Sequence, residues 1–218
     1  MTTDKIEVVA PLRVSTSKIH AFVKSQQQWV INATEKVELK KQNINKLAPE
    51  KYLDGVAVPF LGKQIRIRLK SHALKKVKIE LNEDYFNIYL PARYEGENNS
   101  ELIRLTLINW MKKQALEMAN SYIALHTHKY NLTPRYIKIK TQKSRWGSCG
   151  IHNDINLNWL LIIAPPEVME YVVVHELCHI KERNHSAKFW QLVDIHLPGY
   201  QKQRNWLKQN GMSLMQGL

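Results

Sequence analysis

The segment that decides the fold is His175-Glu176-Leu177-Cys178-His179, which is followed by a further histidine, His185. It has the pattern H-E-x-x-H, in which two histidines four positions apart project from adjacent turns of one helical face. Two imidazoles in this arrangement can share one metal ion. Glu176 lies one step, about 100°, around the helix from His175, so it can reach a water on the metal without displacing a ligand. The segment therefore predicts a helix that carries a metal site and a general base.

The third ligand separates a catalytic metal site from a structural one. A structural zinc site normally has four protein ligands, whereas a catalytic site has three and an open position. His185 follows His175 by ten residues, the offset found in H-E-x-x-H-x-x-G-x-x-H, and is the preferred third ligand. Glu182 replaces the glycine of that pattern and is the competing ligand, while Asn184 can make the turn in a left-handed conformation. A thiolate from Cys149 as a fourth ligand would instead make the site structural.

The regions around this helix predict an α+β fold. Residues 136–140 and 154–159 flank a turn-rich segment and read as a hairpin, and residues 136–141 are expected to line the cleft and pair with an extended peptide. Apolar residues recur at helical spacing from Ser100 to Ile123. Residues 65–69 and 77–81 alternate apolar and charged side chains, as in antiparallel strands.

The N-terminal part is expected to be a smaller region of its own. Residues 6–11 read as a short strand and residues 16–41 as a helix, and the antiparallel sheet follows them. A polar loop over residues 93–100 marks a boundary. We therefore predict an N-terminal strand, helix and antiparallel sheet region over residues 1–95 and a catalytic domain over residues 96–218.

The composition indicates a soluble protein with an anionic partner. The chain has 218 residues, 44% of them hydrophobic, which is ordinary for a globular protein, and no apolar run is long enough for a membrane span. Its formal net charge of +13 favours nucleotide or nucleic acid partners through a basic surface. The first residues lack the features of an export signal, and two cysteines make no disulfide framework, so we expect a cytoplasmic location.

The residues around the motif resemble the YgjP-like metallopeptidase family, which is related to the SprT-like zinc proteases. The resemblance covers nearly the whole chain and is carried by His175 to His185 followed by Ser186, Phe189 and Trp190, and preceded by Arg145-Trp146-Gly147-Ser148-Cys149. It implies a zincin-like metallopeptidase domain, zinc held by His175, His179 and His185, and Glu176 as the catalytic glutamate.

The expected reaction is hydrolysis of a protein or peptide by zinc-activated water, with Glu176 as general base. Another divalent transition metal fits the same ligands. The negative charge that develops on the electrophile needs a second stabilising group, and Arg145 and Tyr200 are candidate substrate or transition-state contacts.

Two other functions stay open. A nucleoside triphosphate pyrophosphatase or phosphohydrolase could use the same metal and glutamate on a phosphorus electrophile, and the positive charge of the protein suits such a substrate. A non-catalytic nucleic-acid-binding protein with a structural zinc is the third reading, and Glu176 argues against it because a structural site needs no unliganded carboxylate there.

Overall fold

The structure is a computed structural model of the 218-residue chain, and it describes residues 7–42, 46–73, 75–94, 99–130 and 132–218. Contacts divide the chain into two compact units, Met1–Asn45 and Lys46–Leu218. The predicted boundary between residues 95 and 96 falls inside the second unit and stays a prediction. Within the described ranges, no helix has the length and apolar character needed to cross a membrane. The cytoplasmic location also stays a prediction.

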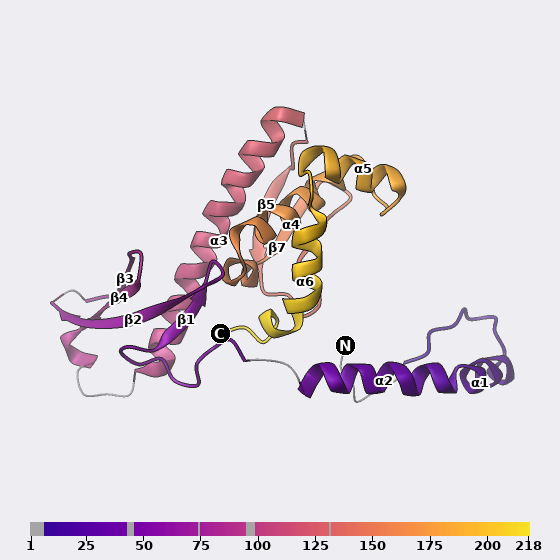
Figure 1. Cartoon of the computed structure of the whole chain (residues 1–218), viewed down its shortest axis with the longest axis horizontal. Coiled ribbons are helices and arrows are strands. Elements are labelled where there is room, and N and C mark those ends of the chain that lie inside the picture. Colours follow the sequence, from indigo (N-terminus) through magenta and orange to yellow (C-terminus); the bar gives the residue numbers. More distant parts are fainter. Residues whose placement is uncertain (1–6, 43–45, 74, 95–98, 131) are drawn as a thin grey trace. The chain divides into compact units, whose positions relative to one another are not determined.

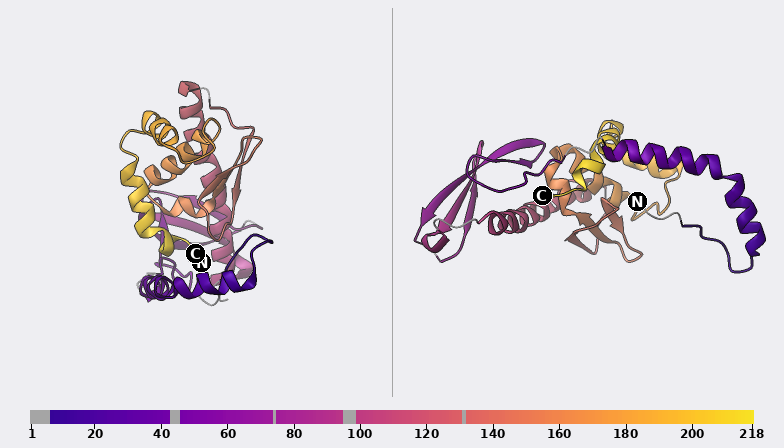
Figure 2. Two further views of the ribbon diagram at one scale, coloured as in Figure 1. Left: turned by 90° about the vertical axis from the view of Figure 1, so that its right-hand side faces the viewer. Right: turned by 90° about the horizontal axis from the view of Figure 1, so that it is seen from below.

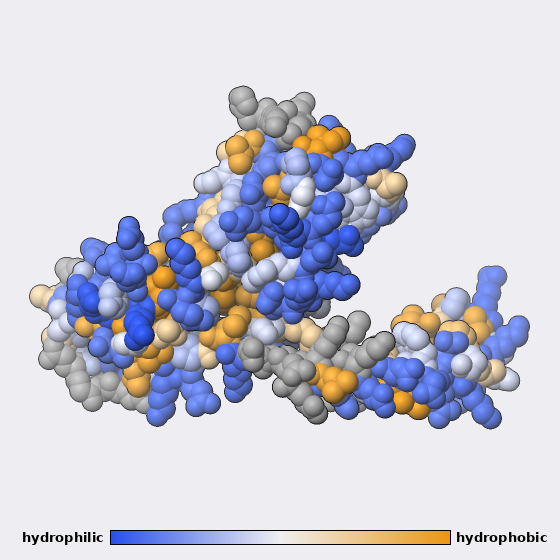
Figure 3. Space-filling model, viewed as in Figure 1, coloured by the Kyte–Doolittle hydropathy of each residue, from blue (hydrophilic) through white to orange (hydrophobic). Residues whose placement is uncertain are grey.

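The first unit consists of the helices α1 (Thr16–Ser25) and α2 (Gln27–Gln42). The single helix expected over residues 16–41 is interrupted at Gln26, where the N–H donates to the carbonyls of Phe22 and Val23. None of the residues of α1 is buried, and Figure 3 shows hydrophobic residues on the surface of this unit. The expected N-terminal strand is wrong over residues 7–11, which are mostly exposed and pair with no described strand. Residue 6 lies outside the described residues.

The first sheet of the second unit has the strand order β1-β2-β4-β3. Its strands are β1 (Ala57–Phe60), β2 (Lys63–His72), β3 (Lys78–Leu81) and β4 (Tyr85–Pro91). The prediction of an antiparallel sheet is wrong at its centre, because β2 and β4 are parallel, whereas β1–β2 and β3–β4 are antiparallel. Burial explains the order: β4 has two fully buried side chains, Phe86 and Ile88, and lies inside the sheet, while β3 exposes Lys78 and Glu80 at the edge.

The long helix α3 (Ser100–Tyr130) begins at the predicted residue, and it contacts both the first sheet and the helix that carries the motif. Its buried side chains follow a helical spacing and include Ile103, Leu107, Met111, Ala115, Ala119 and Ile123. On the side of the first sheet, the Trp110 ring lies 5.5 Å from that of Phe60 and 5.6 Å from that of Phe86, measured between ring centroids. Farther along, α3 packs beside α4 (Pro166–Cys178) (Figure 1).

The second sheet supports the motif helix α4. Its strands are β5 (Tyr136–Lys140), β6 (Gly147–Cys149) and β7 (Asp154–Asn158), in the order β5-β7-β6. The predicted hairpin between residues 136–140 and 154–159 is wrong, because β5 runs parallel to β7. The antiparallel partner of β7 is β6, on its other side. Helix α4 lies between this sheet and α6 (Gln201–Leu214) (Figure 2). The α+β prediction is confirmed, because the described residues form α-helices and two small mixed sheets.

The chain enters α4 through buried backbone. A 3-10 helix, η2 (Trp159–Ile163), buries all five of its residues and is followed by Pro165 and Pro166, the latter as first residue of α4. Nine of the thirteen residues of α4 are buried, as expected for a helix inside a core. His175 and Glu176 therefore lie on the last turn of a helix that is held in the core.

Candidate metal centre

The three histidines predicted to bind metal lie together. His175 is in the last turn of α4, His179 is its C-cap residue, and His185 lies just before α5 (Ala187–His196). Their ligand atoms all lie within 4.8 Å of one another, and the two Nε2 atoms of His175 and His185 are 2.9 Å apart. In the described part of the chain, this is the one group of three or more such side chains close enough to hold an ion.

A backbone contact orients His179. Its Nδ1 is 3.0 Å from the carbonyl oxygen of Glu182, and since a carbonyl can only accept, Nδ1 carries the proton. This leaves the Nε2 lone pair directed to the cluster, an arrangement found in many metal-binding histidines. Glu182, the competing third ligand, thus contributes its carbonyl, and its carboxylate is outside the group of converging ligand atoms.

The chain leaves α4 by a tight turn. The N–H groups of Lys181 and Glu182 both donate to the carbonyl of Cys178, at 3.1 and 3.0 Å. The suggested left-handed turn at Asn184 is wrong, because Leu61 and Asn153 are the non-glycine residues with positive φ among those described. Backbone hydrogen bonds at the helix end therefore provide the turn that the usual glycine would make.

Phe189 forms the base of the cluster. It is fully buried, and its ring centroid lies 4.9, 4.5 and 4.8 Å from those of His175, His179 and His185. Its backbone N–H donates to the hydroxyl of Ser186, the N-cap of α5, at 3.4 Å. Ser186, the residue after His185, caps α5, and this start of the helix places the ring of Phe189 against all three imidazoles.

The chemistry of this donor set fits a bound metal. A histidine must be neutral to act as a ligand. Burial lowers the pKa of His175 to about 3, with contributions from the charges of His179, His185 and Arg204. Burial also lowers the pKa of His179. The Nδ1 of His175 is buried with no hydrogen-bond partner, and its Nε2 is the nitrogen that lies beside His185. A set of three imidazole ligands with an open position suits a divalent transition metal.

Neither cysteine adds a fourth ligand. Cys178 is fully buried, and burial raises the pKa of its thiol to about 12. Burial likewise raises the pKa of Cys149, whose sulfur accepts a hydrogen bond from Arg183 at 3.5 Å. Both are free thiols outside the histidine cluster. This arrangement removes the support for a structural site completed by Cys149.

Glu176 is buried against the edge strand β6. It is 5% exposed, and burial raises the pKa of its carboxyl from 4.5 to about 8. A Cβ atom added to Gly147 would lie 2.6 Å from its Oε1. The prediction that residues 136–141 line the cleft is therefore wrong. Strand β5 is at the opposite edge of the sheet, with β7 between it and β6. The missing Cβ of Gly147 makes room for the carboxylate.

The two predicted substrate contacts have different surroundings. The Arg145 side chain is exposed, and its backbone carbonyl accepts a hydrogen bond from Asn158 at 3.1 Å. Tyr200 is 6% exposed and stacks between Tyr171 and Trp190, with ring centroids 6.0 and 5.5 Å away. Of these two, Tyr200 is in the aromatic group beside the histidines, because Trp190 also stacks on His185 at 5.6 Å.

Two arginines near the site were not predicted from the sequence. Arg183 donates to the backbone carbonyls of Gly150 and Ile151 and to the side chain of Asn153, which ties the exit turn of α4 to the β6–β7 connection. Arg204 lies over the Trp190 ring, with its guanidinium carbon 4.2 Å from the ring centroid. No pattern in the sequence marked either one, since both depend on contacts between distant segments.

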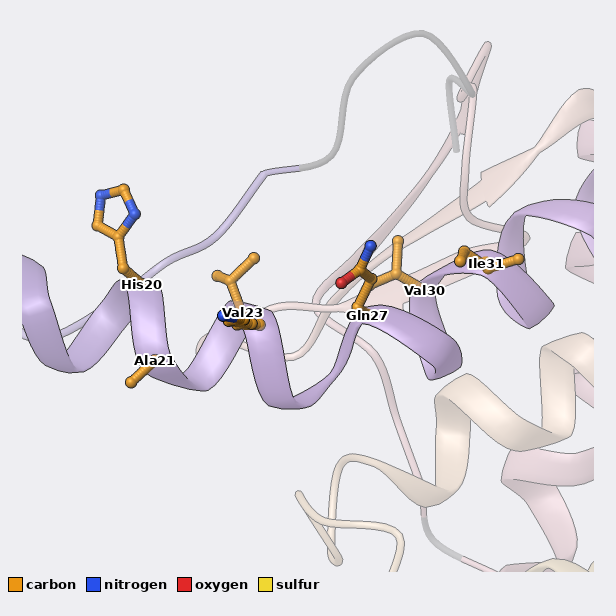
Figure 4. Close-up of a pocket in the computed structure, with 7 residues that line it drawn as sticks. His20, Ala21, Val23, Gln27, Val30 and Ile31 are labelled. Atoms are coloured by element: carbon orange, nitrogen blue, oxygen red, sulfur yellow. The ribbon is translucent and has the colours of Figure 1, made fainter.

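A separate hollow lies in the first unit, and its lining residues are His20, Ala21, Val23, Lys24, Gln27, Val30 and Ile31 (Figure 4). In this view the side chains of Val23, Gln27 and Val30 point to the same side of the helices. The lining has one histidine and no carboxylate or thiol, so it offers no set of metal ligands.

Comparisons with known proteins indicate a hydrolase, and the family description adds a metal. The family model described as "YgjP-like, metallopeptidase domain" matches residues 1–210. The UTP pyrophosphatase of Escherichia coli (strain K12) is 25% identical over 150 residues, which cover 62% of this chain and 87% of that protein.

Proposed function

The chain belongs to the YgjP-like family, and from this premise we propose that it is a zinc-dependent metallohydrolase with Glu176 as general base. The proposed ligands are His175, His179 and His185. The observation that carries the proposal is that their ligand atoms all lie within 4.8 Å of one another. The buried carboxyl group of Glu176 is on the residue that follows the first of these ligands. The family supports the coarser assignment, a metallohydrolase, and the name of the relative supports a hydrolase.

Glu176 handles the proton in the proposed reaction. A divalent metal, when bound, supplies positive charge that favours the ionised carboxylate and polarises both water and the electrophile. Glu176 accepts the proton of the attacking water at a carboxylate oxygen. The burial that raises its pKa makes it a stronger base than an exposed glutamate, and it then transfers the proton to the leaving group. The contact with Gly147 keeps the carboxylate in place.

A peptide bond is the first candidate for the bond that is hydrolysed. Strand β6 pairs with β7 on one side, and among the described strands none pairs with its other edge. Gly147, at the start of β6, is in contact with Glu176. An extended peptide could add to such an edge by backbone hydrogen bonds, which would bring a carbonyl group close to the carboxylate.

A phosphoanhydride bond is the second candidate. Its support is the relative from Escherichia coli, which is named a UTP pyrophosphatase, together with the formal net charge of +13 of this chain. A surface of this charge raises the local concentration of nucleotides. The same base and the same ligands serve both reactions, so the choice depends on how the substrate is held.

Metal removal and two substrates test this function. We expect the purified protein to lose hydrolysis after treatment with a chelator and to regain it with zinc. Wild-type protein is assayed on unfolded casein and on UTP, with released peptides and released pyrophosphate or phosphate as readouts. Turnover of either substrate that follows zinc content supports the proposal. Turnover that is unchanged after complete removal of metal would refute it.

The outer face of the first sheet is the proposed surface for nucleic acid. Arg66, Arg68 and Lys70 are exposed on β2, and the guanidinium carbon of Arg68 lies 3.6 Å from the centroid of the Tyr85 ring. The Nζ atom of Lys70 lies 5.4 Å from the centroid of the Tyr89 ring. Basic side chains on aromatic rings are a common feature of surfaces that bind single strands.

Charge reversal tests this surface. We expect Arg68→Glu with Lys70→Glu to weaken binding of a fluorescein-labelled single-stranded oligonucleotide roughly tenfold or more, because two phosphate contacts are lost. The control is Lys202→Glu with Lys208→Glu, which makes the same charge change at two exposed positions on α6. Fluorescence anisotropy measures both pairs. Equal loss in the two double variants would mean that net charge, and not this face, attracts the strand.

A further inference from the structure

Arg204 holds an uncompensated positive charge beside the metal centre. It lies on α6, is exposed, and takes part in no ion pair among the described residues. Arg104, by contrast, makes two hydrogen bonds of 2.8 Å to the Glu101 carboxylate. The N–H groups of the Arg204 side chain have no such acceptor in the described part of the chain.

The contact with Trp190 orders the guanidinium without using its donors. The guanidinium carbon lies 4.2 Å from the Trp190 ring centroid, and a cation–π contact of this kind uses no N–H donor. The N–H donors of arginine lie in the plane of the guanidinium, where they match the oxygens of a phosphate or carboxylate. The contact therefore positions an exposed side chain whose N–H donors stay available to an anion.

The same tryptophan connects Arg204 to the ligands. The Trp190 ring centroid lies 5.6 Å from that of His185 and 5.7 Å from that of His175. The guanidinium carbon lies 4.2 Å from the Trp190 centroid, and that centroid lies 5.6 Å from the His185 centroid. The guanidinium carbon is therefore at most about 10 Å from the centre of the His185 ring. Tyr200 stacks on Trp190, and Tyr171 stacks on Tyr200, so the aromatic stack continues into the core.

We infer that Arg204 binds a phosphate group of the substrate next to the bond that is hydrolysed at the metal centre. This inference rests on the proposed function and names its substrate class. A phosphoanhydride carries one anionic group at the reacting phosphorus and another beside it, so it matches a metal and a second, nearby cation. A peptide bond carries no charge and has no need of the second cation. Arg204 therefore selects a nucleoside triphosphate or a similar pyrophosphate compound over a neutral peptide.

The test separates phosphate binding from turnover. Calorimetry measures the binding of inorganic pyrophosphate to Arg204→Gln, to Arg204→Lys and to the control Lys202→Gln, each with zinc and without it. Lys202 is exposed on the same helix, about 200° around the axis from Arg204, and its replacement makes the same charge change. We expect Arg204→Gln to weaken pyrophosphate binding roughly tenfold to a hundredfold, Arg204→Lys to weaken it less, and Lys202→Gln to leave it unchanged.

Hydrolysis provides the second readout. We expect Arg204→Gln to raise the KM for UTP while its zinc content and any cleavage of casein stay at the wild-type level. Equal pyrophosphate binding by Arg204→Gln and wild type, or equal loss in the Lys202→Gln control, would overturn the inference. So would an equal loss of both hydrolytic activities in Arg204→Gln. These outcomes differ from a failure of the proposed function, in which the wild-type protein itself shows no zinc-dependent turnover.

Discussion

Glu176→Gln is expected to lose hydrolysis by a factor of about 10² to 10⁴, the usual contribution of a general base, while it keeps its zinc. The amide has nearly the shape of the carboxyl group but cannot accept the proton of the attacking water. Glu176 is not among the converging metal-ligand groups, so its replacement leaves the ligands intact. The assay compares the rate of turnover and the zinc content of the two proteins, side by side, on casein and UTP.

Stability provides a control for this variant. Glu176 is 5% exposed, and its raised pKa means that burial disfavours the carboxylate. An uncharged amide removes that cost, so we expect the thermal unfolding midpoint of Glu176→Gln to equal or exceed that of the wild type in the metal-free state. A variant that is folded, binds zinc and retains full turnover would show that Glu176 is not the base.

Gly147→Ala is expected to lower turnover by about 10²-fold, because a displacement of order 1 Å at a reacting group has an effect of this size. The new Cβ would lie 2.6 Å from Oε1 and 2.7 Å from Cγ of Glu176, distances that van der Waals contact does not allow. The carboxylate has to move away from β6. The measurement is turnover at saturating substrate, together with zinc content, which we expect to be unchanged.

Gly150→Ala is the matched control for this substitution. Gly150 follows β6 directly, but the nearest atom to an added Cβ is 3.7 Å away, an ordinary contact. Neither glycine has a positive φ, so alanine fits both backbones. We expect Gly150→Ala to retain wild-type turnover. If both alanine variants were equally active, the close contact between Gly147 and Glu176 would have no functional importance.

Local sequence patterns predicted the part of the site that one helix and its exit contain. The offsets between His175, His179 and His185 are short, and α4 needs only its own spacing to bring the first two together. His185 required the chain to turn back, and it does so through backbone hydrogen bonds to Cys178 and the cap at Ser186. The left-handed turn at Asn184 was wrong because the helix end itself closes the turn.

Contacts between distant segments could not be predicted in this way. Arg204 is 29 residues from His175, and it joins the site only because α6 packs against α4. The same limit applied to the sheets: alternation identified the strands, but it does not encode the parallel pairing of β2 with β4 or the position of β6 beside Glu176. The strand expected at residues 6–11 needed a partner strand, and the described residues supply none.

The most direct test of the central claim is zinc K-edge X-ray absorption on the purified, zinc-loaded protein. We expect one zinc per chain, with three imidazole nitrogens from His175, His179 and His185, at least one oxygen ligand that is not from the protein, and no sulfur. His185→Ala should remove one imidazole from the spectrum or abolish binding. A sulfur ligand, four protein ligands, or a zinc whose spectrum is unchanged in His185→Ala would contradict the account.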